Sequence, residues 1–326
     1  MLSRVIRSGS PIRFLLALVP LALSCACATA PAVQLEGSEN YLEGVGRLQS
    51  LNGAGLPAEA DSDVLRFGVC GHLYGDPAPW SVFPAQSLTR SVVRIDSENL
   101  DLFVALGDTF KRYEEPYITT TKRVLHRMSM PVFNAPGNHD LTDPEAYVRD
   151  NGPTFGALAF RGCLLVVLDT ELGAGSITDE QLDFLRAVVA SAADDEGIHS
   201  VFFFAHKLLF AQRPRYTSVA ERVNDTDKVR SGNFAGVIQP LIQRLVPDKG
   251  VYWFGGDIGV ADSRSLFYDR DPATGINFVA AGLGDTDRDA YIIVEARASG
   301  EVVLTPVSMS GEQLRPLEYY GIETWR

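Results

Sequence analysis

Short apolar runs alternate along the chain with longer segments in which apolar residues recur every three or four positions. Uninterrupted apolar runs are typical of strands buried on both faces, and the longer spacing is typical of helices with one buried face. The runs predict strands at residues 64–70, 101–107, 131–137, 156–160, 163–170, 200–206, 250–256, 276–282, 290–296 and 301–307. The other segments predict helices at residues 85–99, 115–129, 143–150, 178–195 and 235–246.

The helix expected at 178–195 has the clearest pattern. Thr178 and Gln181 have the spacing of a capping box, and apolar residues from Leu182 to Val189 form one stripe. Apolar strands separated by such helices favour sheets whose faces are covered by helices. We therefore expect a layered α/β sandwich.

The first 27 residues have the pattern of an export signal. Three arginines precede the apolar run "FLLALVPLAL", which is followed by the small-residue stretch "SCACATAP". The run is shorter than the roughly 20 apolar residues of a membrane-spanning helix. Cys25 or Cys27, placed just after it, resembles the lipidated cysteine of a bacterial lipoprotein. The expected location is the periplasm, free or anchored by lipid; a loose apolar helix in a cytoplasmic protein is the alternative.

The rest of the chain is predicted from its composition to consist of three segments. Residues 28–63 are rich in Gly, Ala and acids and are predicted to be a linker, followed by a domain at 64–310 and a C-terminal extension at 311–326. The formal charge of −12 becomes −15 without the three arginines of residues 1–27 (−12 − 3). Such a balance argues against nucleic acid as a partner, and against any membrane contact except through a lipid anchor.

Polar side chains of a few recurring types follow five of the predicted strands. In open α/β sheets the ligand site lies beyond the carboxyl ends of the strands, so these residues are expected to converge. Imidazole, carboxylate and amide groups are ordinary ligands of divalent ions. The strand-end motifs are "CGH" (Cys70 and His72), "GD" (Asp108), "GNHD" (Asn138, His139 and Asp140), "AHK" (His206) and "GGDIG" (Asp257).

The order of these motifs resembles the calcineurin-like metallophosphoesterase family. The segment "GALAFRGCLLVVLDTEL" followed by a helix is also similar to the middle of that family, and the resemblance covers residues 64–310. It implies a four-layer α-β-β-α sandwich that holds two divalent metals bridged by one carboxylate. It further implies a phosphoric ester hydrolase, acting on a phosphorylated small molecule or on a component of the cell envelope.

The resemblance also implies roles for individual residues. His72 would be a ligand of the first metal and Asp108 the bridging carboxylate. Asn138 and His206 would bind the second metal. His139 would be the general acid beside the leaving group, and Asp140 would orient it.

Three positions depart from the family pattern. Cys70 stands where the first motif has aspartate, and Asp257 and Gly259 stand where the last motif has histidines. The second site would keep Asp108, Asn138 and His206 together with Asp257, an oxygen-rich set that favours manganese, magnesium, ferrous iron or calcium. The first site would keep Asp108, His72 and Cys70, whose thiolate could bind zinc. Alternatively, Cys70 is a small buried apolar residue.

These departures leave open whether the site binds one ion or two (Mn, Fe, Mg or Zn) and whether it is active. The charge of one divalent ion and the two negative charges of Asp108 and Asp257 sum to about zero. A site without net positive charge attracts phosphate poorly. Basic residues of the segment 207–230 could restore the charge, and Asp262, Asp285 or Asp287 could replace a lost ligand. Two functions follow: an exported metal-dependent phosphoesterase, or a weak or inactive relative that serves as a binding or accessory protein of the envelope.

Overall fold

Two sheets form the centre of the fold in the computed structural model, which describes residues 48–58, 62–78, 80–224, 226–260 and 264–326. The first sheet has the strand order β11-β10-β1-β2-β3, and the second has the order β4-β5-β6-β7-β9-β8. The strands of the first are β1 (Val64–Cys70), β2 (Leu102–Ala105), β3 (Val132–Asn134), β10 (Ala290–Arg297) and β11 (Val302–Ser308). Those of the second are β4 (Gly156–Phe160), β5 (Cys163–Val167), β6 (Ser200–Ala205), β7 (Gly250–Gly255), β8 (Leu266–Arg270) and β9 (Asn277–Ala281).

The centre of each sheet is parallel. Strands β1, β2 and β3 run parallel in the first sheet, as do β5, β6, β7 and β9 in the second. Antiparallel strands, namely β10, β11, β4 and β8, complete the sheets at their margins. The carboxyl ends of the parallel strands therefore meet at one edge of each sheet.

The apolar strand β6 shows why both sheet faces are covered. Side chains alternate along a strand, so Phe202 and Phe204 face the first sheet and Phe203 faces away from it. The ring of Phe67 on β1 packs edge-on against Phe202 and Phe204, with centroids 5.2 and 5.8 Å apart. On the other face, Phe203 stacks on Trp253 in the apolar layer beneath the helices. A strand that is covered on both faces must be apolar throughout, as the sequence of β6 is.

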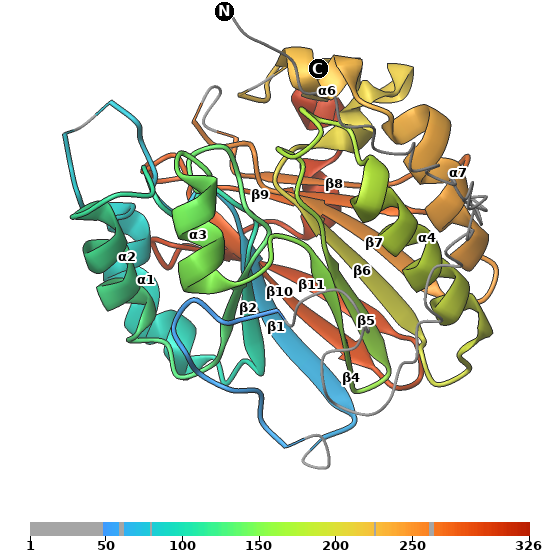
Figure 1. Cartoon of the computed structure of the whole chain (residues 1–326), viewed down its shortest axis with the longest axis horizontal. Coiled ribbons are helices and arrows are strands. Elements are labelled where there is room, and N and C mark those ends of the chain that lie inside the picture. Colours follow the sequence, from blue (N-terminus) through green and yellow to red (C-terminus); the bar gives the residue numbers. More distant parts are fainter. Residues whose placement is uncertain (1–47, 59–61, 79, 225, 261–263) are drawn as a thin grey trace, which may run out of the picture. The chain divides into compact units, whose positions relative to one another are not determined.

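Helices form the two outer layers. Figure 1 shows α1 (Gln86–Ser97), α2 (Tyr117–Leu125) and α3 (Pro144–Asn151) beside the first sheet, and α4 (Asp179–Asp194) and α7 (Gln239–Ile242) beside the second. Two short helices, α5 (Thr217–Ala220) and α6 (Thr226–Ser231), follow β6. The arrangement is the predicted α-β-β-α sandwich. None of the described helices combines the length and apolar composition needed to cross a membrane.

Local details differ from the sequence-based predictions. The helix expected at 235–246 is a π-helical turn at Phe234–Ile238, then α7, then a 3₁₀ turn at Gln243–Leu245. Pro240, which lacks an N–H, lies in this interrupted stretch. The predicted capping box is wrong: the Thr178 side chain makes no cap hydrogen bond, and the Gln181 amide instead bonds to the backbone of Asp169. Strand β8 was not predicted, because only its first residues are strongly apolar.

The domain extends beyond both predicted boundaries. Within the segment expected to be a linker, Leu48 and Leu51 are buried, and the Asn52 side chain donates to carbonyls of Met128 and Met130. In the C-terminal extension, Trp325 is buried edge-on against Phe267 of the second sheet. Both segments therefore pack against the domain, although their composition did not predict this. The predicted export signal at 1–27 lies outside the described residues.

Candidate metal centre

The strand ends bring the predicted residues together through unusual backbone geometry. His72 follows β1 and Asp108 follows β2, and both have positive φ angles, 55° and 53°. Such conformations are costly for residues other than glycine and are found preferentially at functional sites. Gly107, with φ of 78°, is required for a second reason: a Cβ there would lie 2.6 Å from His206 Nδ1. The glycine of the "GD" motif thus lets β2 approach the end of β6 closely.

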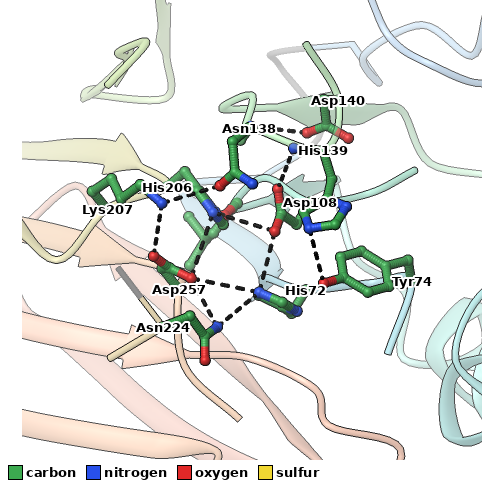
Figure 2. Close-up of polar contacts among 12 residues, drawn as sticks. His72, Tyr74, Asp108, Asn138, His139, Asp140, His206, Lys207, Asn224 and Asp257 are labelled. Atoms are coloured by element: carbon green, nitrogen blue, oxygen red, sulfur yellow. Dashed lines mark hydrogen bonds and ion pairs between the residues drawn. The ribbon is translucent and has the colours of Figure 1, made fainter. Parts of the chain in front are cut away.

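Four side chains meet at this edge, as Figure 2 shows. They are His72, Asp108, His206 and Asp257, all buried, with one ligand atom from each lying within 4.8 Å of the others. Asp108 Oδ2 lies 3.2 Å from His72 Nε2 and 3.4 Å from His206 Nε2. Asp257 Oδ1 lies 3.5 and 3.7 Å from the same two nitrogens. Two imidazoles and two carboxylates form a donor set that could hold one divalent ion.

His206 is held in the form that a metal ligand requires. Its Nδ1 lies 2.9 Å from the Leu106 carbonyl oxygen, which can only accept, so Nδ1 carries the proton. Burial lowers the pKa of His206 to about 3, which keeps the ring neutral. Its Nε2 is buried and has no hydrogen-bond partner among the described residues. An unshared lone pair, fixed by a backbone carbonyl and aimed at two carboxylates, fits a cation.

Asp257 joins this cluster to a buried ammonium group. While Oδ1 faces the imidazoles, Oδ2 lies 3.0 Å from Lys207 Nζ, and both residues are buried. Burial opposes ionisation of Asp257, but the Lys207 ammonium outweighs it and holds the pKa of the carboxyl well below its usual range. The same ammonium lies 3.0 Å from Asn138 Oδ1 and 3.8 Å from Glu171 Oε1. Asn138 therefore contacts Lys207.

His139 lies beside Asp108, at the rim of the cluster. Its backbone N–H donates to Asp108 Oδ1 at 3.0 Å, and its half-buried ring contacts the Tyr74 ring. Nδ1 lies 2.7 Å from the Lys111 carbonyl oxygen and Nε2 lies 3.3 Å from the Tyr74 hydroxyl. The backbone of Lys111 thus orients the imidazole. Burial is the main cause that raises the pKa of the neighbouring Asp108 to about 7.

Asp140 does not bond to the ring of His139, whose two nitrogens face the Lys111 carbonyl and the Tyr74 hydroxyl. Its buried carboxylate accepts backbone N–H groups of Thr109 and Phe110 on one oxygen. The other oxygen accepts the Gly137 N–H and the Asn134 side-chain amide. Asp140 therefore ties the loop after β2 to the loop after β3, and so fixes the positions of Asp108 and His139.

We expect Asp140→Asn to lower the free energy of unfolding by about 1–3 kcal/mol, because an amide NH₂ would face donors that now have an acceptor. Urea unfolding would measure the change. Asp143→Asn is the matched control: Asp143 caps α3 by accepting the Ala146 N–H, a position where asparagine caps equally well. Unchanged stability in Asp140→Asn would contradict the structural role.

Cys70 is not brought into the cluster. Its buried Sγ lies 3.4 Å from the Ala290 carbonyl oxygen on the neighbouring strand β10. Burial raises the pKa of this thiol well above its ordinary value, which disfavours the thiolate that binds metals. The position therefore matches the alternative interpretation, a small buried apolar residue.

The segment after β6 contributes two residues to the site. Of its basic side chains, Lys207 reaches the cluster, whereas Arg213 and Arg215 pair with Asp271 and Asp269. Its Asn224 amide lies 2.9 Å from His72 Nε2 and 2.8 Å from Asp257 Oδ1. No pattern in the sequence marked Asn224 or Tyr74.

The aspartates considered as replacement ligands do not meet the cluster. Asp285 accepts the N–H groups of Gln86 and Ser87 at the start of α1. Asp287 is absent from the group of potential ligands, and Asp262 lies outside the described residues. Asn224 instead occupies the space next to His72 and Asp257.

Comparison with known proteins adds information on the fold alone. No protein-family model matches the sequence, and no curated protein does. Among solved structures, a purple acid phosphatase from yellow lupin (Lupinus luteus) seeds aligns with a TM-score of 0.54 at 16% identity, over 80% of this chain and 54% of that one. The chain thus spans about half the length of the lupin protein.

A second solved structure, a predicted phosphoesterase from Streptococcus pneumoniae TIGR4, aligns over 78% of this chain and 95% of its own, at 11% identity. Its TM-score of 0.36 is too low to support an argument. The sandwich, the strand-end site and the likeness to the lupin structure agree with one another. The fold of this chain is therefore that of the calcineurin-like metallophosphoesterases.

Proposed function

We propose that the protein is an exported, metal-dependent phosphoesterase that hydrolyses phosphate mono- or diesters. The observation that carries the proposal is the buried cluster of His72, Asp108, His206 and Asp257, with His139 at its rim. A divalent ion held by these four residues would polarise a phosphoryl oxygen and supply a nucleophile at neutral pH.

His139 is proposed to protonate the leaving group. When the bond between phosphorus and the ester oxygen breaks, the departing alkoxide must take a proton. Nδ1 donates to the Lys111 carbonyl, so in the doubly protonated ring Nε2 is the nitrogen that would give its proton to the leaving group, leaving a neutral imidazole. Tyr74, whose hydroxyl lies 3.3 Å from Nε2, would hold the ring in this orientation.

The charge of the site supports an anionic substrate. Asp108 and Asp257 contribute two negative charges, a divalent ion would contribute two positive ones, and Lys207 adds one, which leaves +1 (2 + 1 − 2). Glu171, 3.8 Å from Lys207, does not change this sum because it is paired with Lys228 at 3.1 Å. Without Lys207 the sum would be zero. A site of this charge suits a phosphorylated small molecule or a phosphorylated component of the envelope.

Export is proposed from the residues of the N-terminal segment. The basic start, the apolar run and the small residues around Cys25 and Cys27 support removal or lipidation of residues 1–27. The ion is proposed to be Mn, Fe, Mg or Zn, and the acidic chain is not proposed to bind nucleic acid. Mass spectrometry of the mature N-terminus from fractionated cells would test export and lipidation, and an intact Met1 would contradict both.

A binding or accessory protein is the second candidate. Gly259 in place of a ligand, and the burial of all four potential ligands, favour it. The two candidates differ in turnover, since a binding protein has no need of an acid at the position of His139.

Metal dependence separates the candidates. We expect the purified protein to cleave p-nitrophenyl phosphate or bis(p-nitrophenyl) phosphate with added Mn²⁺, and to lose this activity after EDTA treatment and dialysis. Activity and metal content would be measured on the same samples. Metal binding without cleavage of either ester would favour the binding protein, and absence of both would refute the phosphoesterase.

A further inference from the structure

Lys207 contacts two of the four residues that the resemblance assigns to the second metal. Its Nζ lies 3.0 Å from an oxygen of Asn138 and of Asp257, whereas Asp108 and His206, the other two, belong to the four-residue cluster. Glu171 approaches the ammonium from another side, at 3.8 Å. The position is therefore surrounded by oxygen atoms, as a cation site is, and already contains a positive charge.

Asp257 lies between this ammonium and the other three residues of the cluster. Its Oδ1 lies 3.5 Å from His72 Nε2 and 3.7 Å from His206 Nε2, while Oδ2 accepts from Nζ. One carboxylate thus serves two cation positions, one for a divalent ion and one filled by the ammonium. Figure 2 shows both positions on the two sides of Asp257.

A second divalent ion meets two obstacles. The ammonium would repel it at close range, in a buried setting where charge–charge interactions are strong. In addition, Gly259 offers no side-chain ligand where the family pattern has a histidine. The ammonium acts on the second site, and the ligand lost at Gly259 belongs to the first, so neither site keeps its full set of ligands.

We propose that the protein binds a single divalent ion per chain, and that the Lys207 ammonium replaces the second one as a fixed cation that binds a phosphate oxygen. Asn138 is exposed, whereas Lys207 is buried directly behind it. A phosphate oxygen that displaces the Asn138 amide would reach Nζ while another oxygen faces the ion. The inference rests on the phosphoesterase function proposed above and specifies how that site binds its substrate.

The test counts ions and measures phosphate binding on the purified full-length protein. Mn²⁺ titration with metal analysis gives the stoichiometry, and electron paramagnetic resonance distinguishes an isolated Mn²⁺ from a coupled pair. Calorimetry of the Mn²⁺-loaded protein with inorganic phosphate compares wild type, Lys207→Met and Lys249→Met. Lys249 is the matched control because its Nζ also makes two hydrogen bonds, to the Asp195 and Ile198 carbonyls, near the opposite end of the strands.

We expect one ion per chain with an isolated-ion spectrum, and phosphate affinity that falls about tenfold in Lys207→Met, the effect of one lost charge-assisted hydrogen bond. The Lys249→Met protein should match wild type. Two ions in wild type, or unchanged phosphate affinity in Lys207→Met, would overturn the inference and leave the phosphoesterase standing. No ion in wild type would overturn both. If Lys207→Met does not fold, the wild-type ion count and spectrum decide.

Discussion

Asp257→Ala is expected to reduce the affinity for Mn²⁺ by about 100-fold or more, since even loss of a residue that only supports a ligand typically costs 10–100-fold. Asp257 is one of the four converging residues, and its two oxygens face different partners. Removing it takes one donor from the cluster. It also leaves the Lys207 ammonium buried without its nearest carboxylate, which should destabilise the metal-free protein by about 3–5 kcal/mol.

Two measurements separate these effects. Metal analysis after Mn²⁺ loading reports the ligand role, and urea unfolding of the EDTA-treated protein reports the ion pair. The control is Asp269→Ala, which removes an aspartate that pairs with Arg215 away from the cluster. Unchanged Mn²⁺ affinity together with lost stability would show that Asp257 serves only as the counter-ion of Lys207.

His139→Ala is expected to reduce phosphoester hydrolysis by about 10²–10⁴-fold, the usual contribution of a general acid. Metal content should stay unchanged, because the His139 ring bonds to Lys111 and Tyr74 and is not among the four converging residues. His126→Ala is the control, since His126 is an exposed histidine that bonds only within its own helix end.

The leaving group gives this prediction a sharper test. A nitrophenolate needs little protonation to depart, whereas an alkoxide needs a full proton, so His139→Ala should slow an alkyl ester more than a nitrophenyl ester. Steady-state rates on both esters would measure the difference. Equal losses on the two esters would contradict proton donation by the His139 ring, because the alanine variant keeps the backbone N–H that donates to Asp108.

The arrangement of ligands in this site differs from the one that the family pattern implies, and the reason is electrostatic. The resemblance divides the ligands between two metals, but the structure gathers His72, Asp108, His206 and Asp257 into one group. Asn138 contacts the ammonium of Lys207 instead. An aspartate in place of histidine introduces a negative charge, and a lysine one residue beyond His206 is near enough to pair with it. The two sequence features belong together, although 50 residues separate them.

Periodicity and strand-end motifs predicted a layered α/β sandwich, most of its strands and the convergence of His72, Asp108, His206 and Asp257, and the family resemblance added the four-layer order. They could do so because alternation within strands and the shared edge of parallel strands are local or topological properties. The partner of each polar atom depends instead on which loops meet in space. Only the tertiary structure placed Asp140 on backbone amides, Cys70 against β10, Asn224 beside His72, and Lys207 in the position of a second cation.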